Sequence, residues 1–287
     1  MQERSSIFLR LLLNRYHQGP QDAILALLPD DEGKEVSEQP IPSGDIEATL
    51  TSPLDALKRT HYSWLLDSLT ELPKPSVAYL LGLMQEEKAE KIKTALKIKN
   101  KASNLTPLMK RFILGRLAKD FPFKETPPFE QIPETELTPL ANLKKQELVQ
   151  LIDFLGLYDL SEEIHNIVDK RLLENINNAL TPKKKSYVKK CLLSKEKLVT
   201  NRLNLEFWDG DPAKLSKLIH HRGMVRLGYA LCNQDKHLVW HITHILDSGR
   251  GKKLLRYIND KEIPGVTKTL REQVLDVMAF FKKGSKT

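Results

Sequence analysis

Apolar residues recur at intervals of three and four positions along most of the chain, which is the pattern of amphipathic α-helices. Ile7, Phe8, Leu11 and Leu12 are the first example, in a segment that we expect to be helical to about Tyr16. No segment alternates apolar and polar residues convincingly, although a short run such as SVAYLL alone suits a strand as well as a helix. The pattern predicts an all-α fold, an irregular array of short amphipathic helices in two modules.

Two breaks in this periodicity divide the chain. Residues 30–53 hold seven carboxylates and three prolines but few large apolar groups, so we interpret them as a flexible acidic linker. Residues 121–139 hold five prolines, too many for the interior of a helix. The predicted parts are N-terminal helices over 1–29, the acidic linker over 30–53, a first helical module over 54–121, a proline-rich connector over 122–139 and a basic second helical module over 140–287.

Local start and stop signals place helix boundaries within the second module. Ser161 precedes two glutamates, so we expect a helix to begin there. Gly249 is expected to end one helix in a left-handed conformation, with the next beginning near Gly251.

Charge is unevenly distributed. The chain has a net charge of +8, but residues 181–287 carry 23 Lys/Arg against 10 Asp/Glu, a net +13, whereas residues 1–180 carry 22 against 27, a net −5. A basic surface of this kind attracts an acidic partner through a salt-sensitive field. Nucleic acid, anionic lipid and an acidic protein all qualify, and charge alone does not choose among them.

The candidate partner-binding residues of the basic module come from the segments TPKKKSYVKK and HHRGMVRLG. We favour a solvated face that keeps the protein soluble over a nucleic-acid reader for these segments, because no recognition-helix, RNA-binding or zinc-finger pattern supports nucleic acid. The predicted contact residues are Lys183, Lys184, Lys185, Lys189, Arg222 and Arg226.

The strongest sequence candidate for a chemically active site is residues 236–253, KHLVWHITHILDSGRGKK. On a helix, His237, His241 and His244 share one face, and histidines four residues apart can bind zinc. The segment lacks the glutamate of a hydrolytic His-Glu-x-x-His pattern, so we interpret the row as a polar helix face near an interface and expect no metal. The run DSGRGKK fails the Walker A spacing, but backbone N–H groups beside Arg250, Lys252 and Lys253 make these residues candidate anion ligands.

Other catalytic patterns are missing from the sequence. There is no Gly-x-Ser-x-Gly elbow and no Cys-x-x-Cys pair, so neither an enzyme nor a cofactor is expected. Cys191 and Cys232 are expected to be buried, unbridged residues. No run has the apolar length of a secretory leader or a membrane span, so we expect a cytoplasmic protein without membrane insertion.

Residues 59–84, RTHYSWLLDSLTELPKPSVAYLLGLM, carry a family resemblance. The pattern His61-x-Ser63-x-Leu65 resembles the signature of the cytosolic adaptor of bacterial type III secretion sorting platforms. The later rhythm KAEKIKTAL is similar to the helical repeats of the flagellar motor-switch protein. The resemblance covers about residues 55–115 and implies an all-α, non-enzymatic protein that docks helices onto other subunits at the cytosolic face of a membrane complex.

These observations lead to one hypothesis and one rival. The chain is interpreted as a cytosolic helical adaptor that docks other protein subunits, with Trp64 and Leu65 as the anchors of its first module and the basic residues against an acidic surface. The rival is a nucleic-acid-binding protein that uses the same basic C-terminal third.

Overall fold

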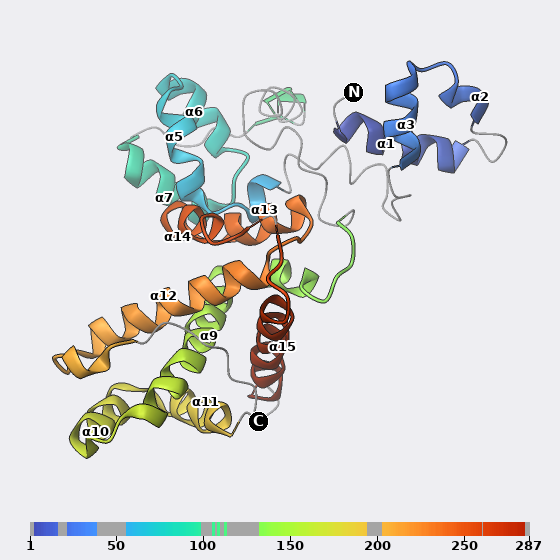
Figure 1. Ribbon diagram of the computed structural model, residues 1–287. Helices are drawn as coiled ribbons and strands as arrows, with labels where there is room; N and C mark the ends of the chain where they lie inside the picture. Colours follow the sequence, from blue (N-terminus) through green and yellow to red (C-terminus); the bar gives the residue numbers. More distant parts are fainter. Residues whose placement is uncertain are drawn as a thin grey trace. The chain divides into compact units, whose positions relative to one another are not determined.

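The computed structural model confirms the all-α prediction (Figure 1). No strand occurs in the part of the chain that the structure describes, which comprises residues 3–16, 22–38, 56–98, 105–106, 108–109, 112–113, 132–193, 203–259 and 261–284. The chain divides into two compact units, which we call unit 1 (Met1–Glu134) and unit 2 (Thr135–Thr287) and describe separately. Much of the predicted connector, residues 122–131, lies outside the described residues.

The N-terminal part of unit 1 corrects the linker prediction. Its helices are α1 (Glu3–Tyr16), α2 (Asp22–Leu25) and α3 (Asp30–Glu38), so the first nine residues of the predicted linker are helical. Acidic side chains fill the first turn of α3, where the helix dipole favours negative charge. Val36 is buried, and Ser6 Oγ of α1 donates a hydrogen bond to Glu35 Oε1 over 2.8 Å. Residues 39–55 lie outside the described part.

The rest of unit 1 consists of short helices: η1 (Tyr62–Trp64), α5 (Leu66–Thr70), α6 (Lys74–Leu81) and α7 (Glu86–Leu96). The ambiguous run SVAYLL therefore belongs to a helix. The Lys88 ammonium of α7 donates hydrogen bonds to the carbonyls of Leu57, Lys58 and Thr60 over 2.7, 2.8 and 2.6 Å. These carbonyls lie within and just after a helical segment at residues 56–59, so Lys88 ties the end of that segment to α7. Burial lowers the pKa of Lys88 to about 8.

Unit 2 contains longer helices than the sequence pattern predicts. Its largest members are α9 (Lys145–Asn166), α12 (Pro212–Ala230) and α15 (Val266–Gly284). The others are η3 (Thr138–Asn142), α10 (Lys170–Ala179), α11 (Pro182–Leu192), η4 (Leu205–Phe207), α13 (Lys236–Ile245) and α14 (Ser248–Leu255). Side-chain caps begin several of them, including Thr181 for α11 and Asp211 for α12.

Helix α9 is the centre of unit 2 and contacts α11, α12 and α15 (Figure 1). Every residue from Phe154 to Ser161 is buried, because the helix is covered on all sides in this stretch. The predicted helix start at Ser161 is therefore wrong. Ser161 lies inside α9 and its Oγ donates to the carbonyl of Tyr158 over 2.7 Å, while Asp169 caps the next helix by accepting from Arg171 N–H.

The crossing of α9 and α12 brings two backbones into contact. A Cβ atom at Gly156 of α9 would overlap the carbonyl oxygen of Ile219 in α12. A Cβ at Gly223 of α12 would in turn overlap the carbonyl oxygen of Ile152 in α9. Only glycine leaves room for this approach, so the two glycines set the separation of the two helices.

Aromatic side chains join α9, α11 and α15. The ring of Phe154 lies 5.2 Å from that of Tyr187 and 4.9 Å from that of Phe281, and the Tyr187 and Phe280 rings are also 4.9 Å apart. The hydroxyls of Tyr158 and Tyr187 share a hydrogen bond of 3.0 Å inside this cluster. Burial raises the pKa of both tyrosines, so both stay neutral and hydrogen-bonded.

Both cysteines are free and buried, as predicted. Burial raises the pKa of the Cys191 thiol to about 12. Cys232 Sγ donates to the carbonyl of Gly228 over 3.6 Å and accepts from the N–H of Asn259 over 3.3 Å. Both side chains therefore serve as small core residues.

Candidate functional site

An open pocket of about 610 Å³ lies between α9, α12 and α14 in unit 2. We call it the basic pocket. Most of its lining residues are polar or charged, and Val149 and Met224 supply apolar side chains. The full lining is Val149, Asp153, Ser216, Lys217, His220, His221, Met224, Asp247, Gly249, Arg250 and Lys253.

Helix periodicity brings the α12 residues to the pocket. Ser216, His220 and Met224 recur every four residues, and Lys217 and His221 form the adjacent row with the same spacing. These two rows lie on neighbouring sides of one helix, so α12 presents both to the same space.

The start of α14 supplies the opposite wall and corrects the prediction for Gly249. Helix α13 ends at Ile245 and α14 begins at Ser248, with Asp247 as its cap. Asp247 Oδ1 accepts from the backbone N–H of Arg250 over 3.1 Å, which satisfies one of the free N–H groups of the first turn. Gly249 thus lies inside the first turn of a helix and has no left-handed backbone conformation.

A chain of charged contacts crosses the pocket wall. Asp153 Oδ2 accepts from Lys184 Nζ over 2.9 Å, and Asp153 Oδ1 lies 2.7 Å from His220 Nδ1. Arg250 Nε donates to His220 Nε2 over 3.2 Å. Because an arginine only donates, His220 Nε2 is the acceptor and its proton lies on Nδ1, directed at Asp153.

Both carboxylates of this wall are compensated. Burial acts to raise the pKa of Asp153, but hydrogen bonds from His220 and Lys184 outweigh it, and the net pKa is lowered. Asp247 accepts from Arg250 NH1 over 2.5 Å and lies 3.5 Å from Lys145 Nζ. These contacts outweigh the effect of burial and lower the pKa of Asp247 to about 2. Both acids therefore remain ionised, with cationic partners already in place.

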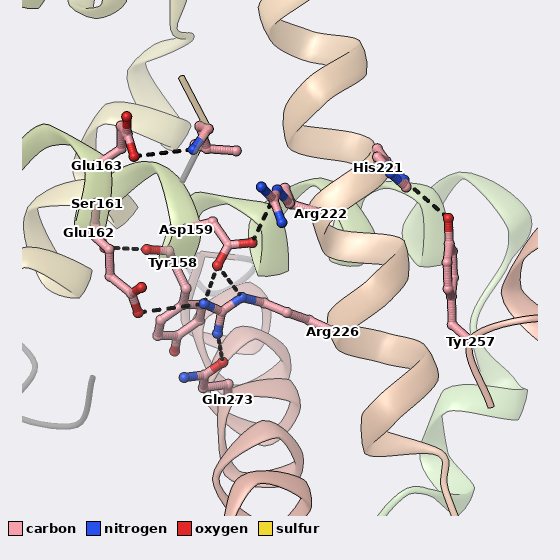
Figure 2. Close-up of polar contacts among 11 residues, drawn as sticks. Tyr158, Asp159, Ser161, Glu162, Glu163, His221, Arg222, Arg226, Tyr257 and Gln273 are labelled. Atoms are coloured by element: carbon pink, nitrogen blue, oxygen red, sulfur yellow. Dashed lines mark hydrogen bonds and ion pairs between the residues drawn. The ribbon is translucent and has the colours of Figure 1, made fainter. Parts of the chain in front are cut away.

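Two lysines of the pocket differ from these residues in their exposure and in their polar contacts. Lys217 and Lys253 are exposed, and neither has a hydrogen bond or ion pair with the residues that the structure describes. His221 lies beside them and its Nδ1 is 3.3 Å from the hydroxyl of Tyr257 (Figure 2). Burial, and then the charges of Lys253 and Arg222, lower the pKa of His221, which indicates a positive local field.

Arg226, predicted as a partner contact, is instead a core residue (Figure 2). Only 3% of its surface is exposed. Its Nε donates to Asp159 Oδ1 over 3.1 Å, its NH2 contacts the same oxygen, and its NH1 donates to Gln273 Oε1 over 2.5 Å. Glu162 Oε1 lies 3.5 Å from NH2. We therefore remove Arg226 from the set of surface contacts, because its guanidinium holds α9, α12 and α15 together.

The other predicted contact residues have different positions. On α11, Lys183 and Lys189 are exposed and Lys185 is half-buried, whereas Lys184 is engaged by Asp153. Arg222 Nε lies 4.0 Å from Asp159 Oδ2. Of the candidate anion ligands, Arg250 and Lys253 line the basic pocket, while Lys252 is exposed outside its lining.

The motif of unit 1 has a local structural role. His61 Nδ1 accepts from the N–H of Ser63 over 3.3 Å and so caps η1, and the Ser63 hydroxyl is 2.9 Å from the same nitrogen. Leu65 is fully buried, so it anchors unit 1 but offers no surface to a partner. Trp64 is half-buried.

The histidine row of α13 does not form a cluster. His241 and His244 are buried, and the His244 ring stacks on Trp240 with a centroid distance of 4.1 Å. His244 Nδ1 donates to the carbonyl of Trp240 over 2.8 Å, since a carbonyl only accepts. The described residues contain no group of three or more His, Cys, Asp or Glu side chains arranged to hold a metal, and His237 does not join such a group.

The buried His244 makes the stability of the fold depend on pH. Burial lowers its pKa from 6.5 to about 4. As the pH falls from 6.5 to 4, the unfolded chain takes up this proton while the folded chain does not, so about 3 kcal/mol of unfolding free energy is lost. Urea titrations at several pH values should show this loss, and His244→Phe should flatten the slope. An unchanged slope in His244→Phe, or an equal flattening in the exposed control His165→Gln, would contradict the assignment.

The pocket residues that sequence reasoning missed are Lys217, His220 and His221. Their signal was their spacing of three and four positions within SKLIHH, which places a lysine and two histidines on one side of a helix. The partner residues on α9 and α14 come from distant segments, which no local pattern connects to α12.

Comparison of the chain with protein-family models, curated proteins and solved structures finds no significant match. None of the helices in the described part combines the length and the apolar character needed to cross a lipid bilayer.

Proposed function

We propose that the chain is a non-enzymatic helical adaptor that binds other protein subunits, with the basic surface of unit 2 against an acidic protein surface. The observation that carries this proposal is a difference within unit 2 between carboxylates that are paired inside the fold and lysines that are exposed. Asp153, Asp159 and Asp247 are paired with cations, and Glu163 accepts from the backbone N–H of Leu203 over 3.2 Å. These four carboxylates are thus compensated within the fold, while lysines such as Lys183 and Lys217 remain exposed.

Exposed lysines of unit 2 lie on α11, which packs against α9, and on the pocket helices α12 and α14. Lys184 reaches Asp153 in the pocket wall, so the start of α11 borders the basic pocket. Four lysines are exposed, namely Lys183 and Lys189 on α11 and Lys217 and Lys253 at the pocket. Such charges mainly accelerate association and select partners by complementarity. Within this proposal, the resemblance of residues 55–115 favours a type III secretion sorting platform, or a related motor assembly, at the cytosolic face of a membrane.

The test is capture of crosslinked partners from native cells with the full chain, before and after nuclease treatment. We expect defined protein subunits to stay bound after nuclease treatment. The variant Lys183→Glu/Lys185→Glu/Lys189→Glu should reduce their recovery by about tenfold, because it reverses the field that an acidic surface meets. The matched control Lys170→Glu/Lys261→Glu/Lys282→Glu changes the same number of lysines, at exposed positions elsewhere in unit 2, and should retain them.

The rival function predicts a different result. A nucleic-acid-binding protein should shift generic duplex or single-stranded DNA in a gel, with an affinity that falls steeply with salt. Loss of this shift in the α11 variant, together with loss of the captured proteins on nuclease treatment, would replace the adaptor proposal.

A further inference from the structure

We infer that the basic pocket is the anchor point of the adaptor surface, and that it receives a short protein segment in which an aspartate or glutamate side chain is flanked by an apolar one. This inference rests on the proposed adaptor function and specifies its partner. The juxtaposition that carries it is the placement of two uncommitted lysines, Lys217 and Lys253, at a pocket that also contains Val149 and Met224.

The charge of the pocket favours an anion. Asp153 and Asp247 line it, but Lys184, His220, Arg250 and Lys145 already contact these two carboxylates. Lys217 and Lys253 have no such contact within the described residues, so their ammonium groups keep their donors for a ligand. A carboxylate placed between α12 and α14 would meet cations from both helices.

The size and lining of the pocket decide which anion fits. A volume of about 610 Å³ suits a ligand with several side chains and is much larger than an inorganic oxyanion needs. Val149 is only half-buried; it gains nothing from a bare phosphate, but it gains contact area from an apolar side chain next to the acid, whereas Met224 is already buried behind it. A mixed acidic and apolar peptide therefore uses both parts of the lining.

The fixed parts of the wall make the pocket preformed. His220 is held between Asp153 and Arg250, and Arg250 is held by Asp247 at the start of α14. These contacts join α9, α12 and α14, so little ordering is required when a ligand enters. Preformed geometry reduces the entropic cost of binding.

The experiment is calorimetric titration of the full chain with a short synthetic peptide in which glutamate and leucine alternate. A second peptide with glutamine in place of glutamate tests the charge. We expect saturable binding of the glutamate peptide, affinity that falls with salt, and at least about tenfold weaker binding of the glutamine peptide. Lys217→Glu/Lys253→Glu should abolish binding of the glutamate peptide.

The matched control is Lys170→Glu/Lys282→Glu, which changes the same charge at exposed positions away from the pocket and should bind as the native chain does. Thermal melts of both double variants report whether each is folded. Equal weakening in both folded variants would overturn the inference in favour of a diffuse field. Tighter binding of inorganic pyrophosphate than of the glutamate peptide, lost in the Lys217/Lys253 variant, would overturn it in favour of a phosphate ligand.

The outcomes also separate this inference from the proposed function. Nuclease-resistant capture of subunits that persists in Lys217→Glu/Lys253→Glu would sink the pocket assignment and leave the adaptor function standing. Peptide binding at the pocket without any captured subunit would sink the adaptor function instead.

Discussion

Replacing Gly156 or Gly223 by alanine is expected to destabilise unit 2 by about 4 kcal/mol. The added methyl group would overlap a backbone carbonyl of the facing helix, Ile219 for Gly156 and Ile152 for Gly223. Backbone atoms do not rotate away as side chains do, so α9 and α12 must separate and lose packing along their whole contact. Urea unfolding followed by far-UV circular dichroism measures the effect.

Gly249→Ala is the control for these variants. Gly249 is also helical, but a Cβ there would meet only Asp247 Oδ1, at an ordinary distance of 3.4 Å. Since alanine is the better helix former, we expect no loss, or a gain of up to about 0.5 kcal/mol. Native stability in Gly156→Ala, or a loss in Gly249→Ala as large as in the crossing variants, would refute the role of close approach.

Arg226→Met is expected to destabilise the protein by about 3–5 kcal/mol, the usual cost of leaving one partner of a buried ion pair behind. Asp159 is only 4% exposed and would lose the guanidinium that contacts it. The guanidinium carbon of Arg226 also lies 5.5 Å from the centroid of the Tyr158 ring, and its NH1 donates a hydrogen bond to Gln273. Loss of Arg226 therefore weakens the contacts among α9, α12 and α15. Urea unfolding at neutral pH is the measurement.

A double-mutant cycle measures the interaction free energy between Arg226 and Asp159. Arg226→Met combined with Asp159→Leu removes both charges, so it should cost clearly less than the sum of the two single changes. Arg256→Met is the control, because Arg256 is exposed at the end of α14. We expect it to cost under about 1 kcal/mol. Additive effects in the cycle would show that the two side chains act separately.

Sequence patterning predicts the helices of this protein well because the 3.6-residue period is a local property. Segments such as Glu3–Tyr16 and Pro182–Leu192 carry both an apolar stripe and clear boundaries. The errors arise where local signals compete with long-range packing. Ser161 resembles a cap but lies within a helix that is buried on all sides, and the acidic run at residues 30–38 becomes helical because Val36 has a core to enter.

The candidate site is harder to predict for the same reason. Charge patterning identifies unit 2 as basic, but it does not show which cationic side chains are paired with carboxylates inside the fold. Arg226 and Asp159 are 67 residues apart, and so are His220 and Asp153. Such pairings follow only from how α9 and α12 cross. Sequence patterning therefore predicts Arg226 as a surface charge and does not single out Lys217, whose ammonium group is exposed at the pocket.

The two native cysteines give the protein a practical property. The chain has only these two, and both are enclosed by other side chains, with the Cys191 thiol held in its unreactive protonated form. A cysteine introduced at an exposed position such as Lys183 or Lys217 would thus be the one site that maleimide reagents reach in the folded protein. Fluorophores, spin labels or photocrosslinkers can be attached there without first rebuilding the core.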